Sequence, residues 1–298
     1  MKRVIANRYV LHEVLGQGGM GVVYHTYDRL TGHDIALKQV TIALNKGDSA
    51  DTDNTAAIEQ RVALAQEFRV LASLRHPHII SVLDYGFDSD GQPFFTMDLL
   101  EDASNLVIFS QSRSYQERLH LTYQMLQALR YLHRRGTLHC DLKPDNVMVI
   151  DGQVRLLDFG LALQQQQQLE QKAVGTLAYM SPEVLQRGQF SIASDLYALG
   201  IMLYEMFSGT HPYRINDISQ LFEDILQHEI DITGLDVEAA LQQLIAEMVQ
   251  KDATERIADI DSVLSRLRDI MGEDAPPETP DMRDSFLQGA QFVGREPE

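Results

Sequence analysis

Residues 139–146 read His-Cys-Asp-Leu-Lys-Pro-Asp-Asn, and residues 158–160, after a short hairpin-like segment, read Asp-Phe-Gly. These stretches supply a carboxylate that can orient a hydroxyl group (Asp141), a cationic amine (Lys143) and two oxygen donors for a divalent metal (Asn146 and Asp158). Phosphoryl transfer needs such groups, because its catalysis consists mainly of positioning the reactants and neutralising charge. The pattern therefore predicts a phosphotransferase.

A glycine-rich stretch precedes this region, and residues 16–21 read Gly-Gln-Gly-Gly-Met-Gly. A dinucleotide-binding turn could have the same spacing, but it needs a strand before it and a helix after it. Here residues 9–15 and 22–28 both have the composition of strands. The flanks therefore favour a phosphate-covering loop between two strands, where glycine lets backbone amides approach the phosphates without a Cβ in the way.

Two further segments belong to the same set. Residues 34–40 read as a strand that carries Lys38, and residues 55–75 have the apolar period of a helix that contains Glu67. Further along, residues 175–183 read Gly-Thr-Leu-Ala-Tyr-Met-Ser-Pro-Glu.

In this order and spacing, the motifs between residues 16 and 256 resemble the protein kinase domain of bacterial Hanks-type (eukaryotic-like) Ser/Thr kinases. The resemblance implies an α+β fold with two lobes. The small β-rich N-lobe with one main helix would span about residues 8–100, and the larger α-helical C-lobe about residues 101–271. The kinase domain would thus occupy residues 8–271, and residues 272–298 would form an acidic, proline-containing linker or tail.

The resemblance also implies catalytic roles. Asp141 would orient the substrate hydroxyl, Lys143 would neutralise charge on the γ-phosphoryl group, and Thr176 would bridge these two residues. Lys38 would contact the α- and β-phosphates of ATP and would pair with Glu67, for which Glu59 is the alternative.

The remaining implied contacts concern the metal ion and the nucleotide. Asn146 and Asp158 would bind Mg²⁺, for which Mn²⁺ is an alternative. The phosphates and the adenine would be contacted by the glycines of the loop, by apolar side chains and by backbone of the link between the lobes, namely Gly16, Gly18, Gly21, Val23, Ala36, Met97, Asp98, Leu100 and Met148.

Two structural anchors are implied as well. Glu183 would form an ion pair with Arg256, and Asp195 would hold the backbone of the catalytic loop from a neighbouring helix. An N-terminal helix carboxylate stabilised by the helix dipole is the other interpretation of Asp195.

The predicted function is transfer of the γ-phosphate of ATP to Ser/Thr hydroxyls of protein substrates. The presence of lysine at position 143 resembles the pattern of Ser/Thr kinases more than that of tyrosine kinases. The alternative is a pseudokinase, which would bind nucleotide or act as a scaffold without transfer, because Cys140 stands where the family usually has arginine. A kinase for small-molecule hydroxyls is disfavoured by residues 175–183, which resemble a platform for protein substrates.

The arginine missing at position 140 coincides with a second missing feature, a phosphorylatable residue in the loop at 161–174. The usual arginine commonly grips a phosphate on the activation loop, yet residues 161–174 contain no Ser, Thr or Tyr. We therefore expect no activation by phosphorylation within this stretch and expect control, if any, from another domain or partner. Cys140 itself is interpreted as a small buried residue rather than a redox sensor.

Composition excludes several classes. The formal charge of −18 argues against a nucleic-acid or anionic-membrane surface, and no apolar run reaches the ~18 residues of a membrane span. The N-terminus lacks the apolar core of a signal peptide, and the single cysteine rules out an internal disulfide, so a cytoplasmic location is predicted. Residues 292–296 (Phe-Val-Gly-Arg-Glu) resemble the opening of an ATPase domain, which suggests a downstream ATPase or sensor domain in cis.

The secondary-structure prediction completes the outline. Strands are expected at residues 9–15, 22–28, 34–40, 79–85 and 94–100, and helices at 115–135, 196–208, 217–228, 237–250 and 259–271. The polar residues 45–54 are expected to form a loop.

Overall fold

The structure, a computed structural model, describes residues 3–18, 21–40, 68, 71–158 and 174–272. The chain divides into two compact units. The β-rich unit comprises Met1–Arg75 and Ile80–Asp102, and the helical unit comprises His76–Ile79 and Ala103–Glu298. Residues 76–79 thus belong to the helical unit, although the predicted N-lobe ran without interruption from about residue 8 to 100. The α+β fold class agrees with the prediction.

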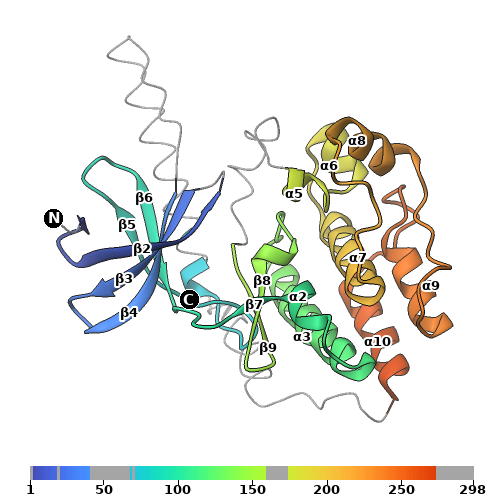
Figure 1. Ribbon diagram of the computed structural model, residues 1–298, viewed down its shortest axis with the longest axis horizontal. Coiled ribbons are helices and arrows are strands. Elements are labelled where there is room, and N and C mark those ends of the chain that lie inside the picture. Colours follow the sequence, from blue (N-terminus) through green and yellow to red (C-terminus); the bar gives the residue numbers. More distant parts are fainter. Residues whose placement is uncertain (1–2, 19–20, 41–67, 69–70, 159–173, 273–298) are drawn as a thin grey trace, which may run out of the picture. The chain divides into compact units, whose positions relative to one another are not determined.

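The β-rich unit is built on one antiparallel sheet (Figure 1). Its spatial order is β1 (Val4–Ile5), β2 (Tyr9–Gly18), β3 (Gly21–Asp28), β4 (His33–Val40), β6 (Pro93–Met97) and β5 (Val82–Phe87). Phe68 and residues 71–73 are helical, whereas residues 74 and 75 are not, so the predicted helix over residues 55–75 ends two residues early. The rest of that prediction lies outside the described residues.

The two faces of this sheet carry different side chains. One face packs a hydrophobic core of Ile5, Tyr9, Leu11, Ile35, Leu37 and Phe94. Because successive residues of a strand point to opposite faces, Ala36 and Lys38 lie on the other face. The ring of Phe68 packs there against Phe95, with ring centroids 5.6 Å apart.

A polar cluster ties the edge of this unit together. The guanidinium of Arg8 donates to both carboxylate oxygens of Asp28 at 2.7 Å and to Asp84 at 2.7 Å. The hydroxyl of Tyr9 donates to the same oxygen of Asp84. The hydrogen bond from Arg8 holds the pKa of Asp28 well below its usual range, although burial opposes this shift. The cluster thus connects the start of β2 with the end of β3 and with β5.

The helical unit begins with short elements, namely β7 (Ser104–Asn105), α2 (Leu106–Ser110), α3 (Tyr115–Arg134), the 3₁₀ turn η1 (Pro144–Asn146), β8 (Val147–Ile150) and β9 (Gln153–Leu156). It continues with α5 (Val174–Leu177), α6 (Pro182–Arg187), α7 (Ile192–Ser208), α8 (Ile218–Gln227), α9 (Ala239–Met248) and α10 (Ile260–Met271). Figure 1 shows α3, α7 and α10 as the long helices of this unit.

Local sequence signals explain where the two central helices begin and how they pack. Ser114 and Glu117 form a reciprocal capping box at the start of α3, and Ser191 and Ser194 do the same for α7. Gly200, in the middle of α7, lies against α9. A Cβ at this position would come within 2.7 Å of a methyl carbon of Val249, so glycine lets the two helices approach.

The predicted elements agree with the structure apart from their ends. The helix predicted at residues 115–135 is α3, and the four later helices correspond to α7, α8, α9 and α10, of which α7 begins four residues earlier than predicted. The strand predicted at 94–100 ends at Met97, and the strand predicted at 79–85 begins only at Val82. Ile79 instead makes an isolated parallel bridge to Leu156 of the helical unit. The predicted loop at 45–54 lies outside the described residues.

Candidate active site

The register of the first sheet gathers four predicted nucleotide contacts of the β-rich unit. Val23 pairs with Lys38 across β3 and β4, and Ala36 pairs with Met97 across β4 and β6. Directly paired residues point to the same face, as do residues two apart on a strand. All four side chains therefore share one face, where Ala36, Lys38 and Met97 are between 4% and 6% exposed.

The three predicted glycines differ in their surroundings. A Cβ built on Gly16 or Gly18 would meet no atom of the described residues within 4 Å. Gly21 has a φ of 137°, and a Cβ there would lie 2.0 Å from the carbonyl oxygen of Gln39. Gly21 is thus required by the close approach of β3 to β4. Of these three glycines, Gly16 and Gly18 leave space beside the backbone, which is the space that phosphates need to approach the backbone amides of such a loop.

The remaining predicted nucleotide contacts lie at element ends or on a second sheet. Asp98 is exposed and Leu100 is half-buried, and both follow the end of β6. Met148 lies on β8 of the helical unit, where it pairs with Asn105 and Arg155. Glu67 and its alternative Glu59 lie outside the described residues.

The helical unit brings the predicted catalytic side chains into direct contact. Lys143 donates from Nζ to Oδ2 of Asp141 at 2.9 Å and to Oγ1 of Thr176 at 2.8 Å. The order differs from the prediction, because Lys143 rather than Thr176 occupies the middle position. Asp141 is 6% exposed. An ammonium group thus lies beside the carboxylate and links it to the segment around α5.

The predicted metal ligands are oriented by the same loop. Asn146 donates from Nδ2 to the carbonyl oxygen of Asp141 at 2.8 Å and to its Oδ2 at 3.0 Å. The amide nitrogen of Asn146 therefore points toward Asp141, and its Oδ1 points away from Asp141. The carbonyl of Asn146 accepts from the N–H of Leu157 at 2.8 Å, so the residue before Asp158 is bonded to Asn146.

The backbone of the site contains two uncommon conformations. Cys140 has a φ of 66° and Asp158 a φ of 52°, both in the left-handed region. A residue with a Cβ adopts this region at a cost of roughly 1–2 kcal/mol, so the surrounding structure must hold it there.

Asp195 supplies such support from α7. Its Oδ2 accepts from the N–H of His139 at 2.9 Å, and its Oδ1 accepts from the N–H of Cys140 at 3.0 Å. The Nε2 of His133 lies 2.8 Å from the same carboxylate. Burial raises the pKa of Asp195, but the hydrogen bond from His133 and the electrostatic interactions with His133 and His139 outweigh it, so the pKa is lowered. The predicted anchor of the catalytic loop is confirmed.

The predicted ion pair between Glu183 of α6 and Arg256 is also confirmed. Arg256 donates from Nη1 and Nη2 to the two oxygens of Glu183 at 2.8 and 3.0 Å. It also donates to the carbonyl oxygens of Ala193 and Gln250 at 2.7 and 2.9 Å. The side chain of Arg256 has no exposed surface. This residue therefore joins α6 to α7 and to the segment after α9.

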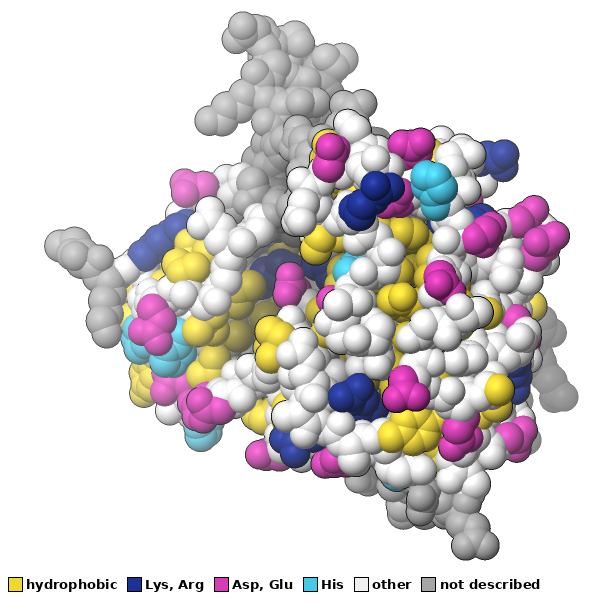
Figure 2. Space-filling model, turned by 45° about the vertical axis from the view of Figure 1, so that its right-hand side comes forward, with side chains coloured by type: hydrophobic (Ala, Val, Ile, Leu, Met, Phe, Trp, Pro, Cys, Tyr) yellow, Lys and Arg dark blue, Asp and Glu magenta, His cyan; other side chains and the backbone are white. Residues whose placement is uncertain are grey.

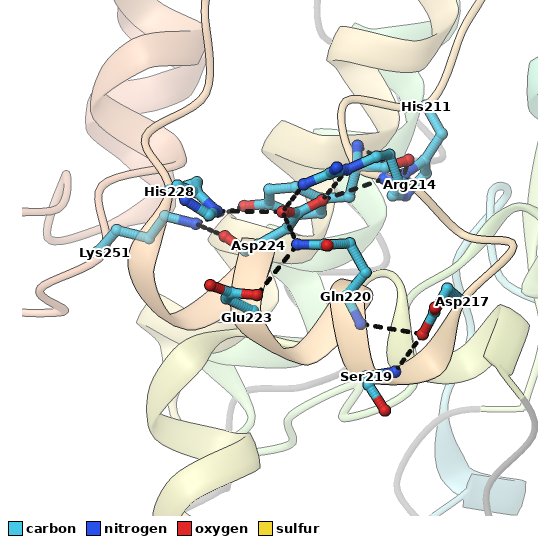
Figure 3. Close-up of polar contacts among 10 residues, drawn as sticks. His211, Arg214, Asp217, Ser219, Gln220, Glu223, Asp224, His228 and Lys251 are labelled. Carbon is cyan, nitrogen blue, oxygen red and sulfur yellow. Dashed lines mark hydrogen bonds and ion pairs between the residues drawn. The ribbon is translucent and has the colours of Figure 1, made fainter.

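Basic side chains surround a second buried carboxylate, that of Asp224 on α8 (Figure 3). Arg214 donates to both of its oxygens at 2.8 and 3.1 Å, and Nδ1 of His228 lies 3.1 Å from Oδ1. Lys251 donates to the carbonyl of Asp224 at 3.2 Å and to the hydroxyl of Tyr213 at 2.7 Å. The hydrogen bond from Arg214 holds the pKa of Asp224 well below its usual range. Burial lowers the pKa of Lys251 to about 8.

Sequence reasoning missed several of these residues. His133 carries no signal, because it is one polar residue near the end of a predicted helix. Asp224 and Arg214 are ten positions apart, and only the turn before α8 brings them together. Tyr179, whose hydroxyl donates to Glu205 of α7, could have been found, since it lies within the quoted motif at residues 175–183.

The chain is similar to known proteins over most of its length. A family model described as the protein kinase domain matches residues 9–266. A probable serine/threonine-protein kinase of Streptomyces coelicolor is 34% identical over 222 residues, which are 71% of this chain and 32% of that protein. The DNA damage-responsive serine/threonine-protein kinase RqkA of Deinococcus radiodurans is 34% identical over 274 residues, which are 85% of this chain and 38% of that protein.

A eukaryotic protein is similarly close. Serine/threonine-protein kinase D2 of Homo sapiens is 36% identical over 217 residues, which are 69% of this chain and 23% of that protein. The aligned part of this chain thus spans less than two fifths of the length of each of these three relatives. None of the helices in the described part of the chain combines the length and the apolar character that a membrane crossing requires.

Proposed function

Because the chain belongs to the protein kinase domain family, we propose that it is an ATP-dependent Ser/Thr protein kinase, which transfers the γ-phosphate to hydroxyls of protein substrates. The names of the relatives support the Ser/Thr class. The observation that carries the proposal is the position of Lys143, whose Nζ lies within hydrogen-bond distance of both Asp141 and Thr176.

This arrangement supports distinct roles for the two charged groups. The carboxylate of Asp141 accepts hydrogen bonds from Lys143 and Asn146 at Oδ2, which holds it in one orientation. Its Oδ1 would accept the proton of a substrate hydroxyl. Lys143 would neutralise charge on the transferred phosphoryl group. Lys38, on the β-rich unit, would contact the α- and β-phosphates, and the meeting of the two sets around one nucleotide stays a prediction.

The donor set fits Mg²⁺. Carboxylate and amide oxygens are ligands that this ion prefers, and Asn146 is oriented through its nitrogen, which leaves Oδ1 as a ligand atom. Asp158 would supply the carboxylate. When bound, the ion would neutralise phosphate charge during transfer. The side chains of the chain then serve to hold the ion and the hydroxyl in place.

A transfer assay tests the proposal. The full chain is incubated with Mg²⁺, labelled ATP and a generic basic protein, and the phosphorylated residues are identified. Asp141→Asn, Asp158→Ala and Lys38→Met are expected to remove most of the label, whereas Asp145→Asn, an exposed carboxylate in the same loop, should keep it. Equal labelling by the Asp158→Ala variant would contradict the metal assignment, and label on tyrosine alone would contradict the Ser/Thr class.

The same assay separates the alternative, a nucleotide-binding pseudokinase or scaffold. That function predicts nucleotide binding without any label on protein. Cys140 was its only support in the sequence, and this side chain is 7% exposed while its N–H donates to Asp195. We expect Cys140→Arg to change the rate by less than about tenfold, which corresponds to ~1.4 kcal/mol.

We infer further that phosphorylation of the activation loop does not switch this kinase on. Residues 161–173 lie outside the described residues, and the nearest Ser and Thr hydroxyls that follow are those of Thr176 and Ser181. Ser181 is 1% exposed, and the hydroxyl of Thr176 accepts the hydrogen bond from Lys143. Phosphosite mapping of active enzyme, before and after phosphatase treatment, tests this inference. Activity that depends on phosphate at either residue would overturn it.

Location and architecture stay predictions. The negative formal charge and the single cysteine support a cytoplasmic protein that binds neither nucleic acid nor anionic membranes. Residues 292–296, whose sequence suggested an ATPase domain in cis, lie outside the described residues. Such a domain, or a sensor domain, would be the source of regulation that residues 161–174 lack.

A further inference from the structure

A group of histidine and acidic side chains lies on the β-rich unit, on the same face of the sheet as the predicted nucleotide contacts, because His25 pairs directly with Ala36. His12 lies on β2, His25 on β3 and Asp34 on β4, so three neighbouring strands contribute one side chain each. One possible ligand atom from each lies within 4.8 Å of the other two. Figure 2 shows histidine and acidic side chains gathered on the surface of this unit.

The sheet itself explains why these side chains meet. His25 pairs with Ala36 and Tyr27 pairs with Asp34, so His25 and Asp34 are diagonal neighbours on one face. The pairing of β2 with β3 is irregular between Leu11 and Val14, which is the segment that contains His12. Such bulges change the direction of a side chain. The rings of His12 and His25 stand edge to face with centroids 5.1 Å apart.

The two ring nitrogens of His25 have different partners. Nδ1 lies 3.3 Å from a carboxylate oxygen of Glu13, which accepts a hydrogen bond when the proton is on Nδ1. This tautomer leaves a lone pair on Nε2. Nε2 lies 3.2 Å from Oδ1 of Asp34, yet it is inaccessible to solvent and makes no hydrogen bond to any described residue. A nitrogen lone pair and a carboxylate oxygen that face each other in this way are suited to share a cation.

We propose that His12, His25 and Asp34 bind a divalent first-row transition-metal ion such as Zn²⁺, and that Glu13 positions His25 for it. Ligand bonds of about 2.0–2.2 Å place neighbouring ligands of a tetrahedral ion about 3.3 Å apart. The 3.2 Å between His25 and Asp34 matches that edge, and the remaining distances, up to 4.8 Å, shorten by side-chain rotation. Imidazole nitrogens favour these ions over Mg²⁺ or Ca²⁺.

The surrounding groups complete a site of familiar chemistry. Metal-binding histidines commonly donate their second N–H to a carboxylate, which is the relation of His25 to Glu13. Three protein ligands leave a fourth position for water. The side chains of Asp34 and Glu13 are 49% and 73% exposed, so an ion can enter from solvent. A bound ion would connect β2, β3 and β4, of which β2 carries Gly16 and Gly18 and β3 carries Gly21.

Zinc titration of the full chain, prepared without a polyhistidine tag, tests the site. The unsubstituted chain is expected to bind one Zn²⁺ with reversal by a chelator. His12→Ala, His25→Ala and Asp34→Asn should each weaken binding by at least about tenfold, and Glu13→Gln by about 10–100-fold. His120→Ala, a half-buried histidine on α3, is the matched control and should bind as the unsubstituted chain does.

Thermal unfolding supplies the second measurement. Zn²⁺ should raise the Tm of the unsubstituted chain, and at the same concentration it should raise that of His25→Ala less, because a ligand stabilises the folded state in proportion to the logarithm of its affinity for it. The proposal is overturned if the unsubstituted chain binds no Zn²⁺, or if both histidine variants bind it as tightly. Should His25→Ala fail to fold, the exposed substitutions Asp34→Asn and Glu13→Gln decide by the same titration.

Discussion

Asp195 and Asp224 are two carboxylates on neighbouring elements of the helical unit, and both have a lowered pKa. Their partners differ. Asp195 is 2% exposed and binds two backbone N–H groups of the catalytic loop together with His133, whose side chain is 3% exposed. Asp224 is itself only 5% exposed, but it binds Arg214 and His228, whose side chains are 66% and 56% exposed.

The comparison shows that the same chemical group serves two purposes. Around Asp195, water is excluded and the hydrogen bonds fix a backbone that contains the left-handed Cys140. Around Asp224, solvent screens the ion pairs, whose contribution to stability is then small. We therefore expect substitutions at the first site to change catalysis and stability together, and substitutions at the second to change local stability alone.

The largest effect is expected for Asp195→Asn. An amide cannot accept hydrogen bonds at both positions, so one N–H of His139 or Cys140 would lose its acceptor and the catalytic loop would shift. A displacement of about 1 Å can cost ~100-fold in rate, and we expect a loss of kcat of at least this size. Steady-state kinetics measure kcat of Asp195→Asn, with Asp224→Asn as the matched control. A kcat within threefold of the unsubstituted enzyme would remove the distinction between the two sites.

A second test uses the buried ion pair between Glu183 and Arg256. Glu183→Gln would leave the guanidinium of Arg256, which has no exposed surface, without its counter-charge. We expect a loss of unfolding free energy of about 3 kcal/mol, measured by denaturant titration. The control is Glu247→Gln, which breaks the one-third exposed pair with Arg266 and should cost less than about 1 kcal/mol. Equal losses would show that burial does not set the difference.

Buried histidines extend the comparison to pH. Burial lowers the pKa of His76 to about 3, and that of His78 to about 4. In the unfolded chain both histidines titrate near ~6.5, so between about pH 4 and 6.5 the unfolded state binds more protons. Stability should therefore fall as the pH falls through this window, by about 1.4 kcal/mol per pH unit for each histidine.

His76→Gln isolates one of these contributions. The variant should reduce the slope of unfolding free energy against pH by about one proton, as measured by urea titrations at pH 7, 6 and 5. A slope identical to that of the unsubstituted chain would mean that His76 is not held neutral by its surroundings.

The smallest effect is expected for Asp224→Asn. Solvent screens its contacts with Arg214 and His228, so the variant should lower the Tm by no more than about 4 °C. The values of kcat and KM should stay within about twofold. A large loss of activity would show that the cluster around α8 contributes to substrate binding rather than to local stability alone.

Much of the fold could be predicted from local patterns. The apolar period of α3 and the hydroxyl residue that caps it appear directly in residues 114–134, because a helix is stabilised by contacts between near neighbours. The catalytic loop could be predicted for a similar reason, since Asp141, Lys143 and Asn146 lie within six residues. Element ends were less accurate, as at Met97, where the strand ends although two more apolar residues, Leu99 and Leu100, follow Asp98.

The sequence by itself determined the family, the fold class and the chemical groups of the candidate site. Only the tertiary structure decided that Lys143 stands between Asp141 and Thr176, that Gly21 is required by Gln39, and that His12, His25 and Asp34 meet. These relations depend on the register of strands and on contacts between distant segments, and a shift of one residue would turn every side chain of a strand to the other face. No pattern of neighbouring residues records that register, so packing alone sets it.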